Sequence, residues 1–305
     1  MSAHRKKLRV MYRSRPVQYP LLAAMRAADA WERAGLDVGD VPYVKGANQG
    51  DKMLADDEID VIFGSHVTPY LRYDEGVPFV YLGQAVNLTD DSVVSREPVS
   101  DLSDLHGKLL ADQTDDEHHP FGNHILFLRR AGLAEDDVRW LNVPEADAVD
   151  AVLDGSADAA IVAPPDDEKA RAAGLHVYTP EPLPMVMATT ITTLWPKVDA
   201  DPDLFKRVLR AVRIGIAFFK DEPGQMRKVM EEDVAKALKI TSADALGKLY
   251  QRNVGVLERT LYPRADAVHN AFLLAVRQRP DLADRLSPMA LWDVHLLREL
   301  DAESA

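Results

Sequence analysis

Four acidic residues and three histidines are concentrated in the stretch LADQTDDEHHPFGNH at residues 110–124. It follows an apolar, strand-like run and precedes the helical pattern ILFLRRAGL, so we expect a polar turn that starts a helix. Three interpretations stay open. His118 and His119 with a carboxylate could bind a divalent metal, although the spacing matches no established motif; either histidine could be a general acid or base; or the acids could simply favour a helix start in a solvated loop. Thr114 and His124 are candidate ligand contacts.

The segment YRSRPVQY at residues 12–19 is a second candidate group. Arg13 and Arg15 could hold a carboxylate or a sulfonate through paired hydrogen bonds. Tyr12 and Tyr19 could stack on an aromatic ring. Alternation along an extended chain points the two arginines to opposite sides, so ordinary surface charge is the competing interpretation.

The segment GSHVTP at residues 64–69 is the third group. Gly64 lets the backbone come close to a ligand, and Ser65 and Thr68 offer hydroxyl groups. His66 is expected where a helix begins, and amides at a helix start favour an anion. The histidine could act as a proton donor or as a simple hydrogen-bond partner.

Weaker candidates for hydrogen bonds to a ligand are Asn142 in NVPEAD and Thr189 and Thr190 in ATTITT. The sequence contains no phosphate loop, nucleophile elbow or dinucleotide fingerprint. Because it has no cysteine, thiol chemistry and zinc–thiolate sites are excluded. We therefore expect no organic cofactor, with a divalent metal as an open possibility.

The charge balance points to a small-molecule partner. The chain has 305 residues and a formal net charge of −13, which argues against nucleic acid or an anionic membrane as the main partner. No segment approaches the ~20 apolar residues of a membrane span. The amino terminus lacks the apolar stretch of a secretory signal, which predicts a cytoplasmic protein.

Short apolar runs alternate with helical patterns through the first two thirds of the chain. KLRVMY, IDVIFGSH and VPFVYLGQAV are expected strands, and RSRPVQYP is an expected loop before the helical pattern LLAAMRAADAWERAGL. A second alternating stretch follows at about residues 90–185, and the remainder is largely helical. This alternation predicts an α/β fold with parallel sheets covered by helices.

Several segments of the sequence resemble those of a known family. LADDEIDVIFGSHVTPYLRYDEGVPFVYLG, DLSDLHGKLLA and VLDGSADAAIVAPP are similar to segments of the type 2 periplasmic-binding-protein fold, and most similar to its NMT1/THI5-like group. That group includes binders of sulfonates, nitrate and pyrimidines. It also includes dihydroxyphthalate decarboxylases and the THI5 enzymes, whose cysteine-rich motif is missing here.

The resemblance implies a two-lobed α/β fold with a helical C-terminal segment, in which residues 1–85 and 190–305 form one lobe and residues 86–189 the other. It also implies that ligand lies in a cleft between the lobes, near the four segments above. The preferred hypothesis is a cofactor-independent decarboxylase of an aromatic carboxylate, in which arginines hold one carboxylate and His66, His118 or His119 protonates the ring. The alternative is the substrate-binding protein of an ABC importer, or a cytoplasmic ligand sensor, for a small anionic or aromatic solute; only an importer would need a permease partner.

Overall fold

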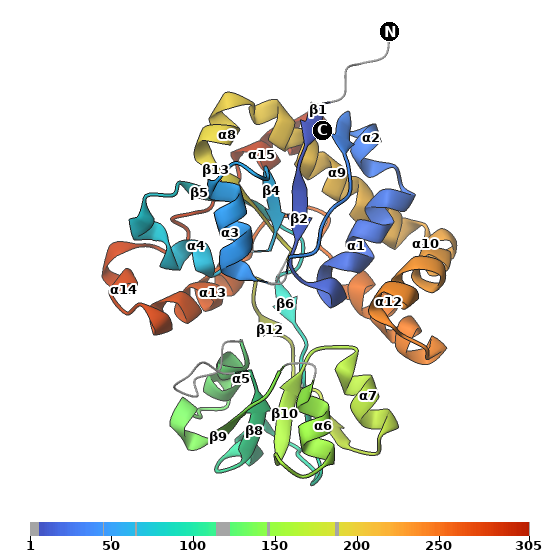
Figure 1. Cartoon of the computed structure of the whole chain (residues 1–305), viewed down its shortest axis with the longest axis vertical. Helices are drawn as coiled ribbons and strands as arrows, with labels where there is room; N and C mark the ends of the chain where they lie inside the picture. The colour runs from blue at the N-terminus through green and yellow to red at the C-terminus, as the bar shows by residue number, and fades with distance from the viewer. Residues whose placement is uncertain are drawn as a thin grey trace. The chain divides into compact units, whose positions relative to one another are not determined.

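The computed structural model describes residues 6–44, 46–64, 66–113, 123–144, 147–186 and 189–304. The chain divides into two units: unit 1 is Met1–Leu88 with Pro184–Ala305, and unit 2 is Thr89–Leu183. The chain passes between them through β6 (Leu88–Thr89) and β12 (Leu183–Pro184), which pair with each other. Each unit has its own sheet and its own helices (Figure 1), so the expected α/β class is confirmed.

Unit 1 contains a four-stranded sheet in the order β2-β4-β13-β5 and a separate pair of parallel strands, β1 and β3. β2 and β4 are parallel, whereas β13 runs antiparallel to β4 and β5. The expectation of an all-parallel sheet is therefore wrong for unit 1. β13 begins at the end of the sheet where β4 and β5 finish, and it runs back between them. The strands of unit 1 are β1 (Lys6–Leu8), β2 (Val10–Tyr12), β3 (Leu36–Val38), β4 (Val61–Phe63), β5 (Phe79–Gln84) and β13 (Thr190–Leu194).

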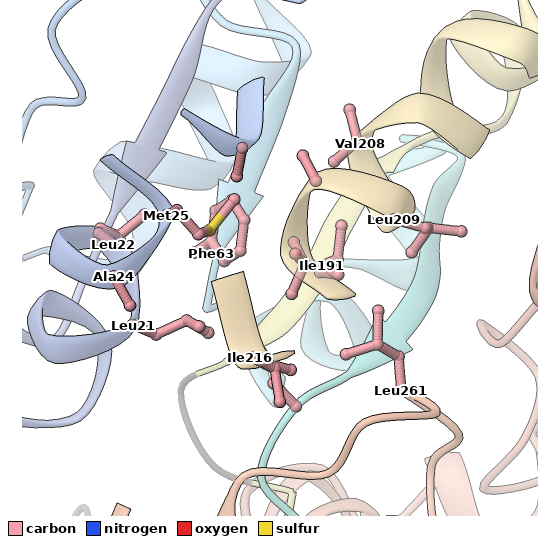
Figure 2. Close-up of a cluster of buried hydrophobic side chains, with 14 of the residues drawn as sticks. Leu21, Leu22, Ala24, Met25, Phe63, Ile191, Val208, Leu209, Ile216 and Leu261 are labelled. Carbon is pink, nitrogen blue, oxygen red and sulfur yellow. The ribbon is translucent and has the colours of Figure 1, made fainter. Parts of the chain in front are cut away.

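Helices cover both faces of this sheet, which explains why its strands are apolar almost throughout. Along β4, Val61 and Phe63 join the core under α1 and α9, while Ile62 between them packs on the opposite face. Figure 2 shows α1 and α9 meeting over Phe63 and Ile191. The helices of unit 1 are α1 (Arg15–Ala27), α2 (Ala30–Arg33), α3 (Ala47–Ala55), α4 (Thr68–Leu71), α8 (Trp195–Ala200), α9 (Pro202–Asp221), α10 (Pro223–Val229), α11 (Ala235–Leu238), α12 (Ala243–Val256), α13 (Ala265–Gln278), α14 (Leu282–Arg285) and α15 (His295–Ser304), with a 3-10 turn at Tyr73–Glu75 and a π-helical turn at Met230–Val234.

Two expectations about the N-terminal region are wrong. The run KLRVMY forms two strands that part at Arg9, because β1 pairs with β3 while β2 pairs with β4. The expected loop RSRPVQYP is mostly helix, since α1 begins at Arg15. Proline is tolerated in a first helical turn, and Gln18 stabilises this one by accepting hydrogen bonds from the amides of Arg13 (2.7 Å) and Ser14 (2.8 Å).

The segment before α15 covers the exposed edge of β5. The Tyr81 amide donates to the Leu291 carbonyl (2.7 Å), and the Asp293 amide donates to the Tyr81 carbonyl (2.9 Å). The Trp292 ring lies 4.9 Å from the Tyr81 ring. An uncovered edge strand invites pairing with other chains, so this segment completes the sheet.

Unit 2 contains a five-stranded sheet in the order β11-β7-β10-β8-β9, in which β8 is parallel to both β9 and β10. β7 runs antiparallel to β10 and β11. The elements are β7 (Ser92–Ser95), β8 (Leu109–Asp112), β9 (Arg139–Asn142), β10 (Ala159–Val162), β11 (His176–Tyr178), α5 (His124–Arg130), α6 (Ala148–Leu153) and α7 (Asp166–Ala172), with 3-10 turns at Leu102–Leu105 and Glu135–Asp137.

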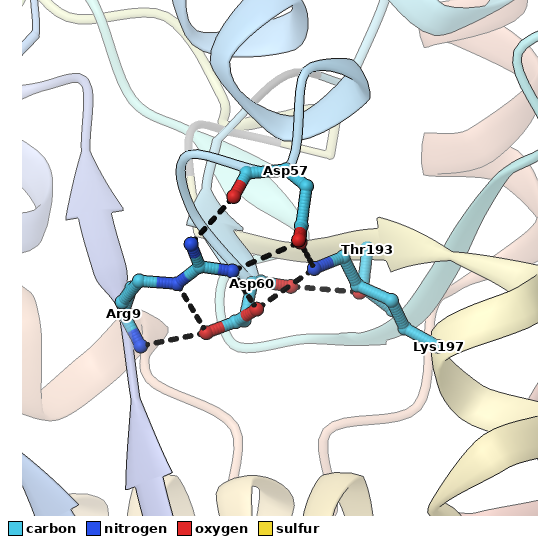
Figure 3. Close-up of polar contacts among 5 residues, drawn as sticks. All are labelled: Arg9, Asp57, Asp60, Thr193 and Lys197. Carbon is cyan, nitrogen blue, oxygen red and sulfur yellow. Dashed lines mark hydrogen bonds and ion pairs between the residues drawn. The ribbon is translucent and has the colours of Figure 1, made fainter.

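An ion network ties the amino ends of β2 and β4 to α8 (Figure 3). Asp60 accepts hydrogen bonds from Arg9 Nε (3.0 Å) and from Lys197 Nζ (2.8 Å). The Thr193 hydroxyl donates to the Asp60 carbonyl (2.7 Å). Burial opposes ionisation of Asp60, but the bonds from Arg9 and Lys197 outweigh it and lower its pKa to about 2.

We expect Asp60→Asn to lower the free energy of unfolding by about 2 kcal/mol at pH 7. Because the folded-state pKa is depressed, the contribution of Asp60 is complete above about pH 4 and is lost as the pH falls towards about 2. Urea unfolding of both proteins at pH 7 and pH 3 measures this, and the difference between them should shrink at pH 3. The exposed control Asp37→Asn should change little, and an equal Asp60→Asn effect at both pH values would contradict the account.

None of the helices in the described ranges is both long and apolar enough to span a membrane.

Candidate functional site

The carboxyl ends of β2 and β4 bring two of the predicted groups together in unit 1. Tyr12 and Phe63 are register partners at the ends of these parallel strands, so Arg13 and Gly64 follow side by side. The Gly64 amide donates to the Thr190 carbonyl (2.8 Å) at the start of β13. The segments that begin at residues 12, 64 and 189 therefore meet at one sheet edge.

Gly64 makes room for the Arg13 side chain. A Cβ atom on Gly64 would lie 3.2 Å from both Cβ and Cδ of Arg13. Gly64 also has a φ of +124°, a conformation that side-chain-bearing residues rarely adopt. Both the backbone and the contact therefore require glycine here.

Gly64→Ala is expected to destabilise the protein by about 1–3 kcal/mol and to weaken ligand binding by displacing Arg13. Thermal unfolding and calorimetric titration measure the two effects. Gly76→Ala is the matched control, since Gly76 also has positive φ (+70°) but nothing lies within 4 Å of its Cβ position. It should destabilise without changing affinity. Equal affinities of the Gly64 variant and the wild type would refute the contact argument.

Arg13 places a desolvated positive charge at this edge. Burial lowers the pKa of Arg13, and the negative charge of Asp51 acts in the opposite direction; a guanidinium nevertheless stays protonated in proteins. Asp51 lies fully buried on α3 and accepts a hydrogen bond from the Thr68 hydroxyl. Thr68, a predicted ligand contact, therefore holds Asp51 in place.

His66 lies beside this charge in a form that does not suit proton donation. Burial, with the charge of Arg13 as a second cause, lowers the pKa of His66 to about 3. Its Nδ1 atom is buried and has no hydrogen-bond partner among the described residues. At neutral pH the imidazole is therefore uncharged, which favours a hydrogen-bond role for His66 over a general-acid role, and both roles stay predictions.

Tyrosine rings line the same edge around Arg15. The Tyr12 and Tyr43 rings lie 5.4 Å apart, and the Arg15 guanidinium carbon is 4.6 Å from the Tyr43 ring centre. Arg15 is exposed and Tyr43 is half-buried, whereas Tyr12 is almost fully buried. Tyr43 and Arg15 are therefore better placed than Tyr12 to contact a ligand. The Tyr19 hydroxyl is bonded to Asp233 (2.7 Å).

Thr189 and Thr190 lie beneath this edge and are fully buried. The Thr190 hydroxyl donates to Gln84 Oε1 (2.6 Å), and Gln84 Nε2 donates to the Thr189 hydroxyl (3.2 Å). With 0% exposure, neither threonine can touch a ligand in this conformation. The two residues instead join β13 to the end of β5.

Predicted residues in unit 2 lie at the carboxyl edge of its own sheet. His124, at the start of α5, forms a hydrogen bond through Nδ1 with Asp112 Oδ2 (2.8 Å) at the end of β8. Asn142 ends β9 as the register partner of Asp112 and is exposed. Ser65, Thr114, His118 and His119 lie outside the described residues, so the open interpretations of residues 110–124 stay predictions.

No group of three or more His, Asp or Glu side chains in the described part of the chain is arranged to hold a metal ion. The unit 1 edge combines a half-buried guanidinium, an exposed one and a tyrosine ring, with an uncharged histidine beside them. Guanidinium groups hydrogen-bond oxyanions through paired donors. The arrangement therefore suits binding of an organic acid better than proton transfer.

The two α/β units give the chain a fold of the periplasmic-binding-protein kind. Residues 26–226 match the family model described as NMT1/THI5 like, and the chain belongs to that family. The resemblance inferred from the sequence is confirmed. No curated protein has a significantly matching sequence.

Solved structures with low sequence identity share the fold. A sulfonate-binding SsuA protein from Methylobacillus flagellatus has a TM-score of 0.72 at 16% identity, with 99% of this chain and 95% of that chain covered. The periplasmic aliphatic sulphonate binding protein SsuA from Escherichia coli has a TM-score of 0.69 at 17% identity, with 95% and 92% covered. DSZB, a desulfurization enzyme, has a TM-score of 0.63 at 16% identity, with 99% and 100% covered. The expected two-lobed binding-protein fold is confirmed.

These findings correct two expectations. The decarboxylase hypothesis is wrong, because the family match and the similar structures that are named as sulfonate-binding proteins support the alternative, a substrate-binding protein. The cytoplasmic assignment is also wrong, because it relied on the amino terminus alone while the similar binding proteins are periplasmic. An enzyme does occur among the structures with this fold.

Sequence reasoning missed Tyr43, Asp51 and Asp112. Tyr43 forms a bridge with Tyr12 that brings it to the site from a separate segment. Asp51 lies inside a helix, and an isolated acidic residue in a helix is normally expected to face solvent. Asp112 could have been predicted, because it directly ends an apolar run in the stretch that contains the histidines.

Proposed function

We propose that this chain is the substrate-binding protein of an ABC importer for a small organic anion. Arg13, together with Arg15 over the Tyr43 ring, binds the acid group of the solute. The observation that carries this proposal is the half-buried Arg13 side chain, which lies against Gly64 at the carboxyl edge of the unit 1 sheet. Membership of the NMT1/THI5-like family and the fold shared with sulfonate-binding proteins support it.

A sulfonate is the acid group we propose first. Its three oxygens can accept several guanidinium hydrogen bonds at once, and a sulfonate stays ionised throughout the physiological pH range. Since His66 is also uncharged above about pH 3, the proposed site needs no proton exchange to bind. Such a protein would work in the periplasm and deliver its solute to a permease.

Calorimetric titration and thermal unfolding with matched compounds test the proposal. Ethanesulfonate or benzenesulfonate should bind and raise the unfolding temperature, because a ligand at one hundred times its Kd stabilises by about 2.7 kcal/mol. Ethyl methyl sulfone, which has a similar shape without the charge, should not. The compounds should be recovered unchanged after long incubation. Binding of no organic anion, or equal binding of the uncharged sulfone, would refute the proposed function.

A further inference from the structure

A groove in unit 1 shares no residue with the candidate site. It lies between α12 on one side and α10 with its following π-helical turn on the other, helices that are neighbours in Figure 1. Its volume is about 670 Å³, and small-molecule sites in proteins have volumes of roughly 300–1,000 Å³. The buried side chains of Met230, Leu246 and Tyr250 line it. The groove therefore has the size and the apolar lining of a ligand site.

Contacts with other helices fix both walls of this groove. In the π-helical turn, Asp233 accepts hydrogen bonds from the Tyr19 hydroxyl (2.7 Å) and from Arg26 Nη2 (2.8 Å), both on α1. On α12, the Tyr250 ring stacks on Phe219 of α9, with the ring centres 5.5 Å apart. Turns of π-helix occur frequently at functional sites. Because each wall is anchored separately, the groove is a preformed feature of unit 1.

Gly247 leaves free space beside the backbone of α12. No atom lies within 4 Å of the position that its Cβ would occupy, and its φ is not positive. Neither a neighbouring side chain nor the backbone conformation therefore requires glycine here, although glycine inside a helix is less stable than alanine. A molecule that approaches the helix closely would need this space. Gly247 is thus explained by an occupant from outside the chain.

The charges around the groove cancel. One wall carries Arg227 and Glu231. The other wall carries Asp244 and Lys248, which form an ion pair (2.9 Å). Although the whole chain has a net charge of −13, neither an anion nor a cation meets an excess of opposite charge here. An uncharged ligand loses least when it leaves water for the apolar lining.

The groove is too small for a protein partner, because ten described residues line it, whereas a stable protein–protein interface uses about 20–30 residues on each side. We propose that it is a second binding site, for an uncharged and largely apolar small molecule. Met230 and Leu246 pack against this ligand, which also lies over Gly247. The site is separate from the proposed sulfonate site and does not depend on it.

Fluorescence titration of the full chain with N-phenyl-1-naphthylamine, an uncharged dye that fluoresces strongly in apolar surroundings, tests the site. Wild type should bind the dye saturably. Gly247→Leu, whose side chain fills the groove, should weaken binding by about tenfold or more. Gly255→Leu is the matched control, because Gly255 is also an exposed glycine of α12 with nothing within 4 Å of its Cβ position, but it does not line the groove. It should bind within about twofold of wild type.

Competition for the bound dye tests the ligand class. 2-Acetylnaphthalene should displace the dye at about tenfold lower concentration than naphthalene-2-carboxylate, which has a similar shape and a charge. The inference is overturned by unsaturable binding to wild type, by unchanged binding to Gly247→Leu, or by equal displacement with the charged compound. A wild-type dimer in sedimentation that Gly247→Leu dissociates would also overturn it, because a second copy would then occupy the groove. Sulfonate binding is measured separately, so either proposal can fail without the other.

Discussion

Replacing Arg13 by Gln is expected to lower the affinity for a small sulfonate by about a hundredfold. A hydrogen bond to a charged group contributes about 1.5–3 kcal/mol, and each 1.4 kcal/mol is a factor of ten in affinity. The upper end applies because Arg13 is desolvated, so water screens its charge poorly. Gln keeps a polar side chain of comparable length while it removes the charge.

Calorimetric titration with ethanesulfonate at constant ionic strength measures this loss. Arg298→Gln is the matched control, because Arg298 is an exposed residue on α15 of the same unit, and it should leave the affinity within about twofold. Circular dichroism must show that the Arg13 variant is folded, because the substitution removes a positive charge that acts on the buried carboxylate of Asp51. An affinity for the Arg13 variant close to that of wild type would remove Arg13 from the site.

Ending the chain at Pro288 is expected to unfold unit 1. Four buried leucines would be lost, each burying a side chain that contributes about 1.5–3 kcal/mol. Their sum, about 6 kcal/mol or more, matches the whole stability of many domains, which is about 5–15 kcal/mol. The edge of β5 would also lose its covering segment. These leucines are Leu291, Leu296, Leu297 and Leu300.

Soluble yield and thermal unfolding of the truncated chain measure this effect. A chain that ends at Leu300 is the matched control, because it keeps all four leucines and loses surface contacts such as the Arg213–Asp301 ion pair and the Tyr262–Asp301 hydrogen bond. Surface pairs contribute about 0–1 kcal/mol each, so the control should unfold within a few degrees of the full chain. A Pro288 truncation that is as stable as the control would show that the segment does not hold the fold together.

Much of the fold could be predicted from local patterns. Buried strands such as Val61–Phe63 and Ala159–Val162 are apolar runs bounded by turn residues, and amphipathic helices such as α9 repeat every 3.6 residues. Strand direction could not be predicted in the same way. The sequence of β13 is like that of any other buried strand, and only its connection through β12 makes it antiparallel to its neighbours.

The candidate site could be predicted in part, because residues after parallel strands gather at one edge. This rule predicts that Arg13 lies beside Gly64, and the two residues do follow neighbouring parallel strands. It could not show that Thr190 turns inward to Gln84, or that Tyr43 joins from another segment. It also could not give the pKa of His66, which depends on burial and on a charge 53 positions away in the chain. These properties arise from tertiary contacts.

The location was wrongly inferred because the reasoning relied on the amino terminus and not on the folded molecule. The decarboxylase hypothesis in turn depended on that location and on histidines near a ligand. A histidine next to a buried guanidinium loses its proton more readily, so proximity to the site is a poor guide to acid–base function. The structure of the site itself is the better guide.

The most direct test of the central claim is a crystal structure of the protein with bound 2-bromoethanesulfonate, whose bromine can be located by anomalous scattering. The account predicts sulfonate oxygens within about 3 Å of guanidinium nitrogens of Arg13 or Arg15, with the Tyr43 ring in contact with the ligand. A well-ordered ligand whose sulfonate lies beyond hydrogen-bond distance of both arginines would contradict it.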